Sequence, residues 1–466
     1  MGRERGRLPA AGECRAVRFP GESTNAFPRA VKAAVVAAAL AAATTLSGCT
    51  GPGANPAVSN PAVSNPAGSE APAAPGAGEA VPGTASPQTP ASEKPAAEAP
   101  TVEAPGSPEG ADCAPADCVD VVVTGDVLLH PALWEQAKRD GGGSYDFRPL
   151  LSGLRPFLVE AELAVCNLET PLAPQGGPYS GYPSFTVPPQ IAPALKATGY
   201  DACTTASNHT VDAGTAGVER TLDTLDDAGL AHTGSYRSSA AAARPLIVDA
   251  GGARIAIVAA TYGLNGLRAD TAWRVDLIET RRLVAKARQA RAAGADIVLA
   301  ALHDGVEYSS TPSARQVQVS RALAESGEFD FVYGHHTHSV LPLEKHAGVW
   351  IAYGLGNSVA AHATDLAVNR EGLTVKLRFT RAAGGWQAGD PRWAAHIMAR
   401  SPARWCALPA ADPCTGTAED AASLARTTAT VNARGADDDG AAAWVPGSAV
   451  PETAVSEAGV SEGAVP

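Results

Sequence analysis

Short runs of β-branched and aliphatic residues alternate, through the middle of the chain, with longer segments whose apolar residues recur every three or four positions. The short runs predict strands at 118–125, 163–166, 200–205, 296–302, 329–333 and 349–353. Two further runs, 244–248 and 254–259, flank a Gly-Gly turn and predict a β-hairpin. Helical spacing predicts helices over 149–160, 189–198, 214–228, 279–293 and 312–325, several of which end at a glycine. Strands alternating with helices are typical of an α/β fold with helices on the faces of a sheet.

Polar side chains follow almost every predicted strand directly. In open α/β sheets the carboxyl ends of the strands meet at one edge, so we expect these side chains to lie close together. They are Asp126, Asn167, Glu169, Asn208, His209, Asp212, His303, Glu307, His335, His336, His338 and Asn357. Carboxylates, amides and imidazoles suit Mn, Fe or Zn, in a site of one or two divalent ions. Because the set contains no thiolate, it excludes a cysteine-rich structural zinc site.

Composition divides the chain into segments. Residues 49–117 form a Pro/Ala-rich stretch with almost no large apolar side chains, which predicts a disordered linker. Residues 427–466 have a similar composition and an acidic run at Asp437–Asp439, which predicts a disordered tail exposed to solvent. The folded domain is therefore expected at 118–382, with 383–426 as its C-terminal extension. Trp393 and Trp405 in that extension are expected to pack in the core.

The N-terminus predicts export. Basic residues precede an uncharged stretch at 33–46, which is short for a membrane span but fits a signal peptide. The stretch ends at Leu46-Ser47-Gly48-Cys49, which resembles a bacterial lipobox, so 1–48 is expected to be a signal peptide and Cys49 the lipidation site. The alternative is a plain signal peptide with a chance cysteine. On the favoured interpretation the protein is anchored by lipid to the extracytoplasmic face of the cell membrane.

Charge and cysteine content narrow the possibilities further. The formal net charge of −12, without a basic stripe in the folded region, argues against nucleic acid as a partner. Export implies an oxidising compartment, in which Cys113, Cys118, Cys406 and Cys414 can form bridges that clamp the two ends of the domain, with the pairing left open. Cys166 and Cys203 lie in apolar strand contexts and are expected to be buried thiols, with a mutual bridge as the alternative.

Six motifs in order carry a family resemblance. They are GDVLL (125–129), NLETPL (167–172), ASNHTVDAG (206–214), LHDGVEY (302–308), GHHTHSV (334–340) and YGLGNS (353–358). Together they resemble CapA-type poly-γ-glutamate capsule synthesis domains of the metallophosphoesterase-like superfamily, over roughly residues 119–379. The resemblance implies an α-β-β-α sandwich, in which two sheets pack together with helices outside. It also implies metal ligands at Asp126, Glu169, Asn208, His303, His336 and His338.

The resemblance assigns chemistry to some residues and leaves others open. His209 would stabilise or protonate the leaving group, and Asp126 would hold the catalytic ion. His335 is the alternative to His336. The superfamily carries a histidine two residues after the first aspartate, where this chain has Leu128, and His130 is one candidate replacement. Asp304 replaces an aromatic residue and is either an extra ligand or a group that disfavours anionic substrates. Glu307 is the candidate to hold the second nitrogen of His303. The residues with a supporting or uncertain role are Asn167, Asp212, Asp304, Glu307, His335 and Asn357.

Three functions follow as hypotheses. The family resemblance implies a role in the synthesis, export or retention of poly-γ-glutamate or a related envelope polymer, with a polyanionic polymer or the capsule synthesis machinery as partner. The first alternative is a metal-dependent hydrolase acting on a phosphoester or a polymer. The second is a polymer-binding domain without chemistry. Because the chain has no P-loop pattern, it is not expected to polymerise glutamate by itself.

Overall fold

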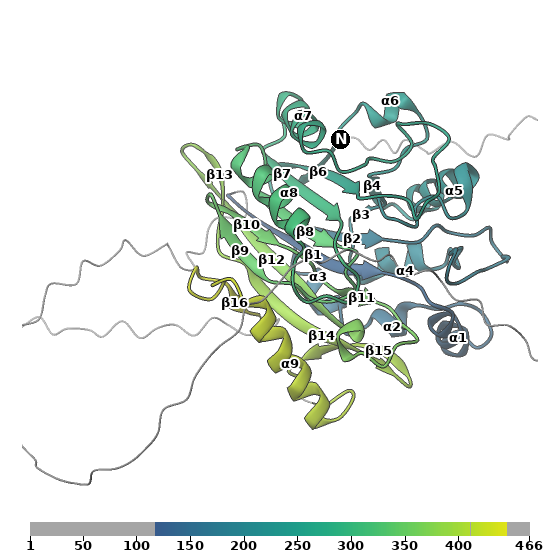
Figure 1. Ribbon diagram of the computed structural model, residues 1–466. Coiled ribbons are helices and arrows are strands. Elements are labelled where there is room, and N and C mark those ends of the chain that lie inside the picture. The colour runs from purple at the N-terminus through teal and green to yellow at the C-terminus, as the bar shows by residue number, and fades with distance from the viewer. Residues whose placement is uncertain (1–116, 411, 445–466) are drawn as a thin grey trace, which may run out of the picture. The chain divides into compact units, whose positions relative to one another are not determined.

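The computed structural model describes residues 117–410 and 412–444, and within them the strands form two sheets (Figure 1). The first sheet contains β1 (Cys118–Val127), β2 (Leu163–Leu168), β3 (Ala202–Thr204), β4 (Ala231–Thr233), β11 (Asn357–Val359), β12 (Glu371–Ala382), β13 (Gly385–Ala388), β14 (Arg392–Arg400), β15 (Ala403–Leu408) and β16 (Ala442–Ala443). The second contains β5 (Leu246–Ala250), β6 (Ala253–Thr261), β7 (Ile297–His303), β8 (Phe331–His335), β9 (Leu343–His346) and β10 (Val349–Ala352). The signal peptide, Cys49 and nearly all of the linker lie outside the described residues.

Helices occupy most of the connections between strands (Figure 1). They are α1 (Pro131–Asp140), α2 (Arg148–Leu151), α3 (Arg155–Leu158), α4 (Ile191–Thr198), α5 (Gly214–Asp227), α6 (Ser239–Ala242), α7 (Thr280–Ala292), α8 (Ala314–Glu325) and α9 (Thr417–Val431), with a 3₁₀ turn at Ala367–Arg370. None of the helices in the described part of the chain combines the length and the hydropathy needed to cross a bilayer.

Alternate residues of the strands point into different apolar cores, as the period of two requires. In β1, Val121 and Val123 face the core between the two sheets, whereas Val122 faces a second core shared with α1 to α4. In β6, Ile257 faces the central core and Val258 faces a third core shared with α7 and α8. The layers are therefore helix, sheet, sheet and helix, which confirms the predicted α-β-β-α sandwich.

The strands nearest the site run parallel and end at the same edge. In the first sheet β1, β2, β3 and β4 are parallel neighbours, and in the second β6, β7, β8 and β10 are. The end of β1 lies directly against the chain before β11, where the Asp126 N–H donates to the Gly356 carbonyl at 2.9 Å. A Cβ on Gly125 would lie 2.3 Å from that oxygen, so only glycine fits before Asp126.

Two predictions of secondary structure need correction. The helix expected over 149–160 is split into α2 and α3, because Pro156 lacks the N–H that a continuous helix needs at that position. The boundary of the tail at Thr427 is too early, since α9 runs to Val431 and β16 pairs with β14. Val431 and Ala436 belong to the central core. The acidic run at 437–439 is exposed, as predicted.

The cysteines also differ from expectation. Cys166 and Cys203 are opposed on β2 and β3 and form a disulfide, so the prediction of buried thiols was wrong and the alternative holds. Cys406 pairs with Cys414 only 8 residues away, so this bridge closes a local loop and does not join the ends of the domain. Cys118 is disulfide-bonded as well, and Cys113 lies outside the described residues. Trp393 and Trp405 are buried in the cores, as predicted.

Candidate metal centre

Side chains from both sheets meet at the carboxyl ends of the parallel strands. Asp126 ends β1, Glu169 follows β2 and Asn208 follows β3, while His303 ends β7 and the segment 335–338 follows from β8. All of these side chains are buried. The predicted site residues thus lie together in space, as the strand order suggested, while their roles as ligands stay predictions.

Asp126 lies at the centre of a polar network. Its Oδ1 accepts a hydrogen bond from Asn167 Nδ2 at 2.9 Å and lies 3.0 Å from His335 Nδ1. Its Oδ2 accepts the His336 backbone N–H at 3.1 Å and lies 3.3 Å from His338 Nδ1. Burial alone would raise the pKa of Asp126, but the contacts with His335 and His338 hold it well below its usual range. The carboxylate is therefore ionised and its position is fixed from several sides.

Glu169 is a buried carboxylate whose oxygens lack hydrogen-bond donors in the described part of the chain. Neither carboxylate oxygen has a hydrogen-bond partner among the described residues. Oε1 lies 3.7 Å from His303 Nε2 and 3.7 Å from His338 Nε2, beyond hydrogen-bonding distance. Burial raises the pKa of Glu169 well above its usual range, and the neighbouring charge of Asp126 adds to the rise. A bound cation would satisfy this carboxylate, so the donor set fits a divalent ion.

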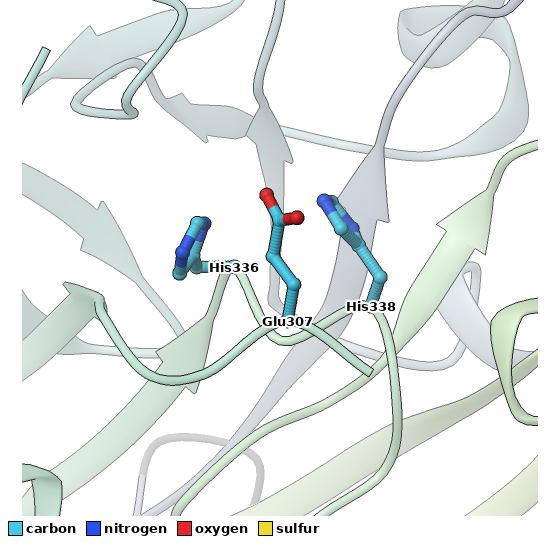
Figure 2. A group of neighbouring side chains, drawn as sticks. All are labelled: Glu307, His336 and His338. Carbon is cyan, nitrogen blue, oxygen red and sulfur yellow. The ribbon is translucent and has the colours of Figure 1, made fainter. Parts of the chain in front are cut away.

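The carboxylates and imidazoles form two groups of ligand-type atoms, each group within 4.8 Å. The first is Asp126, Glu169 and His338, and the second is Glu307, His336 and His338. Figure 2 shows the side chains of the second group pointing into the same space. Although burial opposes it, the charges of Glu169 and Asp126 raise the pKa of His338 to about 9. Binding of an ion there must therefore displace a proton from His338 near neutral pH.

Asn208 and His303 contact each other beside these groups. Asn208 Oδ1 lies 2.9 Å from His303 Nε2, and Asn208 Nδ2 donates to Asn265 Oδ1 at 3.3 Å. Burial and the neighbouring His336 hold the pKa of His303 well below its usual range, so the imidazole is neutral. A neutral imidazole and an amide oxygen are suitable metal donors once they release each other.

His209 is oriented by a carboxylate. Its Nδ1 lies 2.7 Å from Asp212 Oδ2, which also accepts the Phe185 backbone N–H at 2.7 Å. This contact is made through a hydrogen on Nδ1 and leaves Nε2 free to face a substrate. Asn357 Oδ1 contacts His338 Nδ1 at 3.0 Å in a similar way. Asp212, Asn167 and Asn357 therefore position other residues.

Glu307 and Asp304 have different neighbours from those that the sequence suggested. Glu307 does not hold the second nitrogen of His303, whose Nε2 contacts Asn208 and whose Nδ1 lies 3.5 Å from Asn167. Asp304 Oδ1 is paired with Arg315 at 2.8 Å, and Asp304 belongs to neither group of ligand-type atoms within the described residues.

The structure also gives the neighbours of the positions that the motifs left open. His336 belongs to a ligand group, whereas His335 contacts Asp126 and belongs to neither group within the described residues. His130 accepts the Ala361 N–H at 3.2 Å at the start of α1 and joins no ligand group in the described chain. Leu128, at the position of the missing histidine, packs in the core under α1 to α4.

Sequence reasoning missed the partly exposed residues that lie beside the histidines of the site. Tyr262 lies with its ring 4.6 Å from that of His336, and Tyr308 lies 6.2 Å from that of His338, with both tyrosines partly exposed. Asn265 contacts the Tyr262 hydroxyl at 3.2 Å. Tyr308 could have been found from the sequence, because it belongs to LHDGVEY, one of the six motifs of the family resemblance. Tyr262 and Asn265 belong to no motif and could be placed only by the fold.

Comparison with known proteins gives a consistent family. Residues 120–362, just over half of the chain, match the model of the family described as bacterial capsule synthesis protein PGA_cap. The chain is 24% identical over 252 residues to the capsule biosynthesis protein CapA of Bacillus anthracis, covering 51% of this chain and 59% of that protein. It is 27% identical over 284 residues to a probable polyglutamine synthesis accessory protein of Mycobacterium tuberculosis, covering 52% of this chain and 74% of that one.

Solved structures with similar folds are more distant. The calcineurin-like phosphoesterase YfkN of Bacillus subtilis has 14% sequence identity and a TM-score of 0.40, over 67% of this chain and 97% of that one. A phosphatase of Mycoplasma pneumoniae has 12% identity and a TM-score of 0.39, over 60% of this chain and 94% of that one.

Proposed function

We propose a role that starts from family membership: this chain belongs to the bacterial capsule synthesis family PGA_cap. It acts in the synthesis, export or retention of poly-γ-glutamate or a related envelope polymer, through a divalent-metal centre with hydrolase chemistry. The observation that carries the metal centre is the buried carboxylate of Glu169, unpartnered among the described residues and beside Asp126 and His338.

The ligands of this centre would be Asp126, Glu169, Asn208, His303, His336 and His338. An ion bound by them supplies Lewis-acid chemistry, since it lowers the pKa of water toward about 7 and polarises a phosphoryl or acyl oxygen. Asn167 and Asn357 hold Asp126 and His338 in place through the contacts described above. Asp126 and His338 are therefore held in place before an ion arrives, whereas Asn208 and His303 would first have to release each other.

His209 provides proton transfer in this proposal. Asp212 accepts the hydrogen on Nδ1 and so orients the imidazole with Nε2 toward the leaving group, to which the doubly protonated ring would donate its Nε2 hydrogen as the bond breaks. Phe185 supports the pair twice, because its N–H binds Asp212 and its ring lies 4.9 Å from that of His209. The fixed orientation removes the entropy of finding the reactive rotamer.

The partner we propose is a polyanionic polymer or the machinery that makes it. With a net charge of −12 the chain does not attract a polyanion by long-range electrostatics. The ion would provide the local positive charge that a carboxylate-rich substrate needs at the centre, while Tyr262 and Tyr308 line its entrance. We further propose that Cys49 anchors the protein to the extracytoplasmic face of the membrane, on the basis of the lipobox in the sequence.

The metal centre is tested first, by elemental analysis of the purified protein. The full-length chain, purified without chelator, is analysed for Mn, Fe and Zn beside an Asp126→Ala/His338→Ala variant and a Glu135→Ala control on the exposed face of α1. We expect near-stoichiometric metal in the wild type and the control, and none in the double variant. Absence of metal and of metal affinity in the wild type would refute the proposal.

The biological half of the proposal is tested in a capsule-forming strain that lacks its own copy of the gene. Complementation with the wild type should restore surface polymer, and complementation with Asp126→Ala should not. Full restoration by Asp126→Ala would instead support a polymer-binding role without chemistry.

A further inference from the structure

Glu307 is a carboxylate for which the established family motifs give no role. It lies in the loop after β7, its side chain is exposed, and no hydrogen bond or ion pair of this side chain occurs within the described residues. One of its carboxylate oxygens nevertheless lies within 4.8 Å of ligand-type nitrogens of His336 and His338 (Figure 2). An exposed glutamate is free to turn toward water, so its place above two buried imidazoles needs a cause.

The backbone of this loop is fixed against the turn that carries the two histidines. The Tyr308 N–H donates to the Thr337 carbonyl at 2.7 Å, and Thr337 lies between His336 and His338 in the chain. Gly305 has a φ of 138°, and a Cβ there would lie 2.4 Å from the Thr337 side chain. The loop therefore packs on the turn as closely as its atoms allow, and this contact sets the origin of the Glu307 side chain.

The charges around Glu307 call for a cation. Asp126 and Glu169 form one group of ligand-type atoms with His338, and Glu307 forms the other group with the same histidine, so the three carboxylates face one region. In the described part of the chain no lysine or arginine forms an ion pair with any of the three. The imidazoles of His336 and His338 are the nitrogen donors available to offset this negative charge together with an ion.

We propose that Glu307 and His336 hold a second divalent ion on the solvent side of the centre, next to a buried position formed by Asp126, Glu169 and His338. This inference rests on the metal centre proposed above. Glu307 supplies the carboxylate of the outer position. Because His338 serves the buried position, the outer ion keeps coordination positions open for water or substrate.

The difference in burial predicts a difference in affinity. The ligands of the inner position are all buried, whereas Glu307 is exposed and must give up side-chain freedom to bind. The outer ion therefore binds more weakly and exchanges with solution, and its occupancy follows the metal concentration.

The experiment is a titration of the chelator-treated full-length chain with Mn²⁺, followed by equilibrium dialysis and elemental analysis. The variants are Glu307→Gln, which keeps the size and removes the charge, and Glu135→Gln as an exposed control on α1. We expect two ions per wild-type chain in two steps, and the same in the control. Glu307→Gln should weaken the second step by about 10- to 100-fold and leave the first unchanged.

Three results would overturn the inference. One ion in both the wild type and Glu307→Gln, or two ions in both with equal affinities, would remove Glu307 from the metal centre while leaving the proposed function intact. No ion in the wild type would refute both. A thermal unfolding scan of each metal-free variant shows that the comparison is made on folded protein, and the exposed position of Glu307 predicts unchanged unfolding temperatures.

Discussion

The substitution Glu169→Gln distinguishes a metal ligand from a structural residue by whether it raises or lowers the unfolding temperature of the metal-free chain. Neither oxygen of Glu169 has a hydrogen-bond partner within the described residues, and burial raises its pKa well above the usual range. A carboxyl whose pKa is higher in the folded than in the unfolded chain loses stability as the pH rises above its unfolded pKa, by about 1.4 kcal/mol per pH unit until the folded pKa is reached. Without metal at pH 8, we therefore expect Glu169→Gln to unfold at the same temperature as the wild type or a higher one.

With metal bound, we expect the wild type to unfold at a higher temperature than Glu169→Gln. An ion at 100 times its dissociation constant stabilises the wild type by about 2.7 kcal/mol. A folded unit of about 330 residues has an unfolding entropy near 0.7 kcal/mol/K, so this stabilisation raises the midpoint by about 4 °C. Glu169→Gln removes a charged ligand of the buried position, and we expect it to lose most of this shift. The assay is thermal unfolding followed by circular dichroism, after chelator dialysis, with and without Mn²⁺.

Glu371→Gln is the matched control, because Glu371 is equally buried but has a partner. Its Oε2 accepts a hydrogen bond from Arg426 Nε at 3.1 Å. Removing that charge should destabilise the metal-free chain by about 1–3 kcal/mol and leave the metal-induced shift intact. If Glu169→Gln behaves like Glu371→Gln in both conditions, Glu169 is a structural residue and the argument from its unpaired oxygens is wrong.

Three further predictions address proton transfer, pH and the C-terminal segment. Asp212→Asn should lower the turnover of any substrate hydrolysed at the centre by about 100-fold with unchanged metal content, because His209 loses its fixed tautomer, and steady-state kinetics beside elemental analysis would show this. The charges of Glu169 and Asp126 outweigh burial and raise the pKa of His338 to about 9, so Mn²⁺ affinity measured by calorimetry should rise by about tenfold per pH unit from pH 6.5 to 9. In the metal-free chain the stability contributed by His338 is complete below pH 6.5 and is lost as the pH rises to 9. Deleting residues 427–466 should lower the unfolding midpoint, because it removes Val431 and the other core residues that follow, and an unchanged midpoint would contradict their packing.

The strands and their meeting point were predictable because both depend on local signals. A run such as 118–125 contains β-branched residues in sufficient density to specify a strand whatever surrounds it. Strand order then follows from short right-handed connections, which bring the residue after each strand to one edge. The gathering of Asp126, Glu169 and His303 therefore needed no knowledge of side-chain contacts.

The remaining features depend on tertiary contacts that leave no local signal. Residues 427–444 are mostly small or polar and look like a disordered segment, yet they are ordered by packing against β14 and the central core. The partners of His303 are Asn208 and Asn167, which lie at the ends of other strands and could be assigned only from the folded chain. Pairing of Cys166 with Cys203 required the register of β2 against β3.

Among the described residues, positive φ angles outside glycine are concentrated at the proposed metal centre. Apart from glycine, the described residues with positive φ are Ala347, in the turn between β9 and β10, and four at the site: Asn265, Tyr308, His336 and His338. Such conformations cost about 1–3 kcal/mol each and persist only where surrounding contacts determine them. Here the contacts are two hydrogen bonds: the His336 N–H donates to the Asp126 carboxylate, and the Tyr308 N–H donates to the Thr337 carbonyl. His338 places its Nε2 3.7 Å from Glu169 Oε1, and in the metal centre that we propose both atoms would bind the ion, which is a use for the strained turn.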